Sequence, residues 1–87
     1  MKPVLRILIV EDSDDDAQLM IREFQRSGYA ADYERVETKA DMETMLARRP
    51  WDIILSDYSM PRFSAMGALA TLKASGLDIP FIVISGT

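Results

Sequence analysis

The sequence has 87 residues and contains neither cysteine nor histidine. The absence of cysteine excludes a disulfide framework. The absence of both residue types excludes a Cys/His zinc site, and the lack of histidine excludes histidine-based catalysis. A metal ion would have to be bound by oxygen, which favours Mg²⁺ or Ca²⁺. The candidate ligands are therefore oxygen-bearing groups.

Basic residues are outnumbered, with ten Lys and Arg against fourteen Asp and Glu and a net charge of −4. This balance argues against binding nucleic acid or an anionic membrane through bulk charge. No apolar run reaches membrane-spanning length. The apolar start is interrupted by Arg6 and followed by the acidic stretch 11–16, which does not fit a signal peptide. We expect a cytoplasmic protein without direct contact to nucleic acid or membrane.

Glycine patterns that cradle phosphates are also missing, since neither GxxxxGK[ST] nor GxGxxG occurs. Nucleotide binding is therefore not expected. Hydrophobic residues make up 48% and charged residues 28% of the chain, which is typical of a globular protein. The length suits one domain, and we expect residues 1–87 to form it.

Three apolar segments and one weaker, more polar segment suited to a sheet edge, Ala31–Val36, alternate with three segments of helical periodicity. Strands are predicted at Leu5–Val10, Ala31–Val36, Trp51–Ser56 and Phe81–Ile84. Helices are predicted after caps at Ser13, at Thr38 or Lys39, and at Ser64, with ends at Gly28, Pro50 and Gly76. This alternation predicts an α/β fold with a parallel sheet, right-handed crossovers and helices on both faces.

Each predicted helix has a set of apolar residues expected to face the sheet. The inward residues are Ala17, Met20, Ile21 and Phe24 in the first helix, Met42, Met45 and Leu46 in the second, and Met66, Leu69, Ala70 and Leu72 in the third. Trp51 and the methionines are interpreted as packing residues.

Acidic residues stand where two of the buried strands end. Glu11 and Asp12 follow the first strand and Asp57 follows the third. In open parallel sheets ligands bind beyond the carboxyl ends of the strands, and in the flavodoxin-like order 2-1-3-4-5 the switch point lies between strands one and three. We therefore expect these acids to converge, with Ser85 of the fourth strand on the same rim.

Converging carboxylates raise one another's pKa unless a cation compensates their charge, and Mg²⁺ suits this task. An aspartate can also attack phosphorus to form an acyl phosphate, which a hydroxyl such as Ser85 could hydrogen-bond. Simpler readings stay open, because Asp12 could cap a helix and both Asp57 and Ser85 could be turn residues. The joint placement of Asp12 and Asp57 favours a site.

Three segments together resemble the motifs of response regulator receiver domains. Ile7–Asp12 looks like their acid-pair strand, Asp57–Pro61 like their phosphoacceptor loop, and Ile79–Gly86 like the strand that ends in their switch hydroxyl. The resemblance covers the whole chain. It implies a flavodoxin-like sheet of order 2-1-3-4 that lacks the fifth strand-helix unit of a complete receiver.

The resemblance also implies a role for each site residue. Asp57 would be phosphorylated, and Asp12 and Asp57 would ligate Mg²⁺, with Glu11 acting mainly through ordered water and charge. Ser59 would offer its main-chain carbonyl to the metal, and Ser85 would sense the phosphoryl group. The donor would be a phosphohistidine of a sensor histidine kinase or phosphotransfer protein. The receiver would catalyse only its own modification, without independent substrate turnover.

Two departures from the family pattern leave an alternative open. Ala65 stands where receivers often have glycine, and no residue can be assigned to the lysine and the aromatic residue of strand five, so output switching is expected to be weak. The alternative is a phosphorylation-independent interaction module that self-associates through the strand-four edge, as a homodimer or by domain exchange. A small aspartate-nucleophile phosphatase, suggested by Asp12-Ser13-Asp14, would leave Asp57 and Ser85 unexplained.

Overall fold

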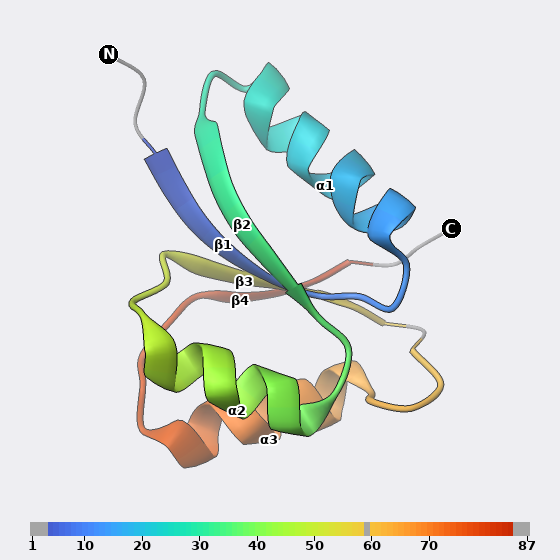
Figure 1. Ribbon diagram of the computed structural model, residues 1–87, viewed down its shortest axis with the longest axis vertical. Coiled ribbons are helices and arrows are strands. Elements are labelled where there is room, and N and C mark those ends of the chain that lie inside the picture. Colours follow the sequence, from blue (N-terminus) through green and yellow to red (C-terminus); the bar gives the residue numbers. More distant parts are fainter. Residues whose placement is uncertain (1–3, 59, 85–87) are drawn as a thin grey trace.

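The computed structural model describes residues 4–58 and 60–84. Its elements are β1 (Val4–Val10), α1 (Asp14–Arg26), β2 (Ala30–Val36), α2 (Lys39–Arg48), β3 (Ile53–Asp57), α3 (Ala65–Ser75) and β4 (Phe81–Ile84). The four strands form one parallel sheet of order β2-β1-β3-β4. Helix α1 covers one face, and α2 and α3 cover the other (Figure 1). The predicted strand order is confirmed, and no fifth strand occurs within the described ranges.

Strand β1 lies inside the sheet and supplies the centre of both cores. Its last four residues, Ile7–Val10, are fully buried. Ile7 and Ile9 belong to the cluster under α1, whereas Leu8 and Val10 belong to the cluster under α2 and α3. This alternation follows from the two-residue period of a strand, and the continuous apolar run follows from burial on both faces. The loop that follows β1 therefore starts from the best-packed part of the sheet.

The three helices begin at the predicted caps. The hydroxyl oxygens of Ser13, Thr38 and Ser64 each accept a hydrogen bond from the backbone N–H three residues further on. Each bond satisfies one of the donors that a helix start leaves unpaired. Helix α3 ends at Gly76, whose positive φ of 78° is a conformation that glycine adopts without strain.

The third strand begins two residues later than predicted and ends one residue later. Trp51 is buried, but its indole N–H donates to the main-chain oxygen of Met45, so it packs beside α2 rather than in the strand. Asp52 accepts two hydrogen bonds from the Arg6 side chain and one from the Arg6 N–H. These two residues therefore anchor the entrance to β3.

The predicted inward face of α3 is partly wrong. Met66 is 70% exposed and Ala70 is exposed, whereas Leu72 is buried as predicted. The buried residues are Ala65, Ala68, Thr71 and Leu72. Thr71 can enter the core because its hydroxyl donates to the Gly67 carbonyl at 2.9 Å. The helix is apolar on most sides, so its sequence periodicity did not identify the packed face.

Strand β4 is the less covered edge of the sheet. Ile82 and Val83 are 44% and 46% exposed, although both are apolar. The described helices are each too short or too polar to cross a membrane.

Candidate functional site

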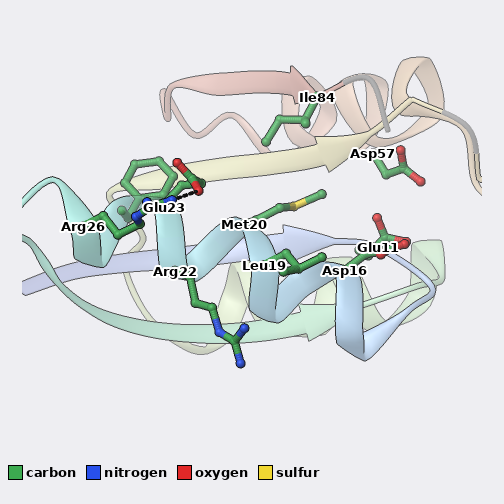
Figure 2. Close-up of a pocket in the computed structure, with 10 residues that line it drawn as sticks. Glu11, Asp16, Leu19, Met20, Arg22, Glu23, Arg26, Asp57 and Ile84 are labelled. Atoms are coloured by element: carbon green, nitrogen blue, oxygen red, sulfur yellow. Dashed lines mark hydrogen bonds and ion pairs between the residues drawn. The ribbon is translucent and has the colours of Figure 1, made fainter. Parts of the chain in front are cut away.

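Three acidic side chains meet at the carboxyl ends of β1 and β3. The register pairs Val10 with Ser56, so the residues that follow, Glu11 and Asp57, come side by side. One carboxylate oxygen from each of Glu11, Asp12 and Asp57 lies within 4.8 Å of the other two. Figure 2 shows the Glu11 and Asp57 side chains facing each other at one end of a groove. The fold thus brings together residues that are 46 positions apart.

The three acids differ in how far they reach into solvent. Glu11 is only 2% exposed, Asp57 is half-buried and Asp12 is exposed. Two backbone contacts fix Glu11, because its N–H donates to the Val36 carbonyl at 3.0 Å and its Oε1 accepts from the Ser13 N–H at 3.1 Å. The site therefore has a rigid, buried member and an exposed member that a metal ion can reach.

Burial raises the pKa of Glu11 from 4.5 to about 7. Burial is the largest cause of this rise, and the value of about 7 also includes a hydrogen bond with the Asp12 carboxylate, which requires a proton between the two groups, and the charges of Asp57 and Asp12. The hydrogen bond from the Ser13 N–H acts in the opposite direction. Near neutral pH the Glu11 side chain is consequently either protonated or, when it is charged, stabilised by a nearby cation.

A groove of about 630 Å³ leads to the acids along α1. Glu11, Asp16 and Asp57 lie at one end of it, and Met20 and Ile84 line it between α1 and β4 (Figure 2). A second hollow of about 370 Å³ borders the Asp12 side and is lined by Asp12, Glu37, Met60, Pro61 and Arg62. The acids can therefore be approached from both sides of the β1–α1 loop.

Two of the predicted site residues, Ser59 and Ser85, lie outside the described residues, and their roles stay predictions. The residues just before them are in contact, because the N–H of Tyr58, which follows β3, donates to the Ile84 carbonyl of β4 at 3.1 Å. Ala65 is the first residue of α3 and is buried. Within the described ranges only glycines have positive φ, so the loop before α3 does not need glycine at this position.

The sequence patterns missed one residue beside the acids, Arg35 of β2. Its side chain donates to the main-chain oxygen of Glu11 at 3.2 Å and lies 3.6 Å from the Asp14 carboxylate. A contact between a strand side chain and a distant backbone carbonyl leaves no spacing signal in the sequence. The sequence contained only one hint of this contact, a positively charged residue on the strand beside β1, which the acid pair follows.

The family model of the response regulator receiver domain matches residues 7–87. This chain belongs to that family. The receiver is 29% identical over 89 residues to "Two-component system protein A" of Emericella nidulans, an alignment that covers 97% of this chain and 12% of that protein. The chain thus spans about an eighth of this curated relative, and the match concerns that share of it alone.

Solved receivers share the fold. A CheY-like receiver domain from Methylobacillus flagellatus is 27% identical with a TM-score of 0.68, and the match covers 97% of this chain and 71% of that one. The MaeR response regulator bound to beryllium trifluoride is 24% identical with a TM-score of 0.78, covering 95% and 68%. A Francisella receiver domain is 21% identical with a TM-score of 0.73, covering 93% and 65%.

The donor set of the acidic cluster fits Mg²⁺. Carboxylate oxygens are hard ligands, and two oxygens bound on opposite sides of one Mg²⁺ lie ~4.2 Å apart. One oxygen from each of Glu11, Asp12 and Asp57 lies within 4.8 Å of the other two, slightly beyond this span, so the three acids are near enough to share one ion. An exposed Asp12 also leaves room for the water ligands that Mg²⁺ retains.

Proposed function

We propose that this receiver accepts a phosphoryl group on Asp57 from the phosphohistidine of a sensor histidine kinase or a phosphotransfer protein. Asp12 and Asp57 would hold Mg²⁺, and Glu11 would act through charge and ordered water. The approach of three carboxylates at the ends of two adjacent strands carries the proposal. Receivers of two-component systems generally work with such partners, and family membership supports this class of donor.

The transfer is a displacement at phosphorus. A carboxylate oxygen of Asp57 forms the new bond, and the bond between phosphorus and the donor imidazole nitrogen breaks with its electron pair staying on that nitrogen. The product is an acyl phosphate on the receiver. When bound, Mg²⁺ supplies positive charge for the phosphoryl oxygens.

The residues of the chain position the nucleophile and keep it accessible. Asp57 is the last residue of β3. The three residues before it, Ile54–Ser56, are buried, so the core holds the backbone of Asp57 in place. Its side chain is half-buried at the end of the groove beside α1, which gives a donor group a path to it. Ser59 would supply its main-chain carbonyl to the metal, and Ser85 would hydrogen-bond the phosphoryl group.

Incubation with acetyl phosphate and Mg²⁺, followed by intact-mass measurement, tests the proposal. The wild-type protein is expected to gain the mass of one phosphoryl group, and the gain is expected to disappear when the metal is chelated. Asp57→Asn keeps the size of the side chain and removes the nucleophile, so this variant is expected to gain none.

Asp52→Asn is the matched control, because Asp52 is also a half-buried aspartate of the β3 region but pairs with Arg6 away from the acidic cluster. It is expected to be modified like the wild type. An unmodified wild type, or equal modification of the Asp57→Asn variant, would show the assignment of Asp57 to be wrong.

Family membership does not favour the alternative of a phosphorylation-independent module. The exposed residues of β4 are compatible with self-association but do not point to a particular occupant. A cytoplasmic location stays a prediction that fits the family.

A further inference from the structure

Arg35 reaches from the edge strand β2 to the loop that carries the acid pair. It is the next-to-last residue of β2 and pairs in register with Ile9 of β1. Its side chain is 29% exposed, and Nη1 donates to the main-chain oxygen of Glu11 at 3.2 Å. That oxygen belongs to the peptide unit between Glu11 and Asp12. The hydrogen bond therefore restrains the rotation of the peptide that joins two of the three acids.

The charge of Arg35 is engaged mainly by acids outside the cluster. Its Nε lies 3.6 Å from Oδ1 of Asp14, and Nη1 lies 3.8 Å from Oε1 of Glu37. The other oxygen of Asp14 accepts from Nε2 of Gln18 at 2.9 Å. A connected set of polar contacts thus runs from β2 to the first two turns of α1 and holds the β1–α1 loop from outside.

We propose that Arg35 is a positioning residue for the metal site, which sets the orientation of the Glu11–Asp12 peptide so that both carboxylates face a common Mg²⁺. The inference rests on the proposed function. Arg35 touches neither metal nor phosphoryl group in this role. It acts through the loop backbone, as groups behind metal ligands do when they fix ligand orientation.

The charge of Arg35 and its positioning role predict opposite changes in Mg²⁺ affinity when Arg35 is replaced. A cation close to a metal site repels Mg²⁺, and its removal would also take away the positive charge paired with Asp14 and Glu37, so charge alone predicts tighter Mg²⁺ binding. Loss of the hydrogen bond to the Glu11 carbonyl frees the loop and predicts weaker binding. Removing groups that orient metal ligands typically weakens affinity ~10–100-fold, which exceeds the screened effect of one partly exposed charge.

Calorimetric titration with Mg²⁺ distinguishes the charge effect of Arg35 from its positioning effect. Arg35→Met is expected to weaken Mg²⁺ binding ~10-fold, at the lower end of the range for such groups. Arg35→Lys keeps the charge and has N–H donors on a single nitrogen, so its Mg²⁺ affinity is expected to fall between this variant and the wild type. Arg49→Met is the matched control, since Arg49 is 32% exposed, pairs with Asp32 at 3.2 Å and lies away from the acids. It is expected to bind Mg²⁺ like the wild type.

Amide hydrogen exchange without metal provides a second reading. In Arg35→Met, exchange of the Ser13 N–H, which donates to Glu11, is expected to be faster, while the Ala68 N–H in α3 keeps its wild-type rate. Equal acceleration at both amides would indicate general destabilisation and would overturn the positioning role.

The titration distinguishes the two proposals from each other. Unchanged or tighter Mg²⁺ binding by Arg35→Met, with normal binding by the wild type, overturns the role of Arg35 and leaves the proposed function standing. A wild type that binds no Mg²⁺ overturns the proposed function, and the role of Arg35 falls with it. If Arg35→Met does not fold, the Arg35→Lys variant decides, and wild-type affinity in that variant counts against positioning by the guanidinium group.

Discussion

Glu11 carries a carboxylate that is buried beside two other acids. Because its pKa is raised from 4.5 to about 7, the folded protein binds this proton more strongly than the unfolded chain does. The free energy of unfolding of the metal-free protein therefore falls as the pH rises from the lower value through the upper one. The loss is complete above the folded-state pKa.

Glu11→Gln removes this ionisation and keeps an oxygen for the Ser13 N–H. At about pH 8, without metal, the variant is expected to be more stable than the wild type by up to ~3 kcal/mol, since one pKa unit corresponds to about 1.4 kcal/mol. At about pH 4 the two proteins are expected to differ little in stability, because the carboxyl group is then mostly neutral in both states. Urea unfolding in the presence of a chelator measures both values.

Destabilisation of Glu11→Gln by the same amount at both pH values would contradict this account. It would show that shape or hydrogen bonding, rather than charge, dominates at this position.

At the scale of the element, the start of α3 depends on one hydroxyl. Ser64 Oγ accepts from the Gly67 N–H at 3.0 Å, and the first turn of α3 contains no acidic residue. Ser64→Ala is expected to lower the free energy of unfolding by ~1 kcal/mol, the usual loss for a helix N-cap. Urea unfolding monitored by Trp51 fluorescence measures the change.

Ser64→Asp is the control for this prediction. It retains the capping oxygen and adds a negative charge at the positive end of the helix dipole, so it is expected to match or exceed the wild-type stability. An alanine variant as stable as the aspartate variant would mean that the cap contributes nothing.

The elements differed in how much of their structure the sequence revealed. Strand β1 and helix α1 were predictable because each combines a strong periodic pattern with a clear boundary, the acids after Val10 and the cap at Ser13. The face of α3 was not, because Met66 and Leu69 are as apolar as its buried residues. The packing of α3 against α2 and β3 decides which side is buried, and this depends on tertiary contacts.

The site shows the same division. Convergence of the acids could be predicted from strand order, because Glu11 follows β1 and Asp57 ends its parallel neighbour β3. The contact of Arg35 with the Glu11 carbonyl could not, since it depends on the length and path of one side chain across two strands. Sequence patterns identify where elements end, and packing decides which side chains then meet there.

At the scale of the whole molecule, the sheet is unevenly covered. Ile54 in β3 is fully buried in the core under α2 and α3, whereas Ile82 in β4 is 44% exposed. Ile54→Ala is expected to lower the free energy of unfolding by ~3 kcal/mol through lost burial and a cavity. Ile82→Ala, the same chemical change, is expected to cost less than ~1 kcal/mol because little area leaves water.

Chemical denaturation of both variants provides the comparison. Equal losses at the two positions would show that β4 is covered in solution, for example by another copy of the chain.

The two inner strands have opposite electrostatics at their two ends. Where they begin, Arg6 of β1 holds Asp52 before β3 through a two-pronged ion pair at 3.1 Å, which keeps the pKa of Asp52 below its ordinary value. Where they finish, Glu11 and Asp57 bring like charges together. An ion pair therefore holds the two strands together at one end, and like charges repel each other at the other end. A cation bound between the acidic ends would therefore relieve this repulsion at the end of the strand pair where β1 is most deeply buried.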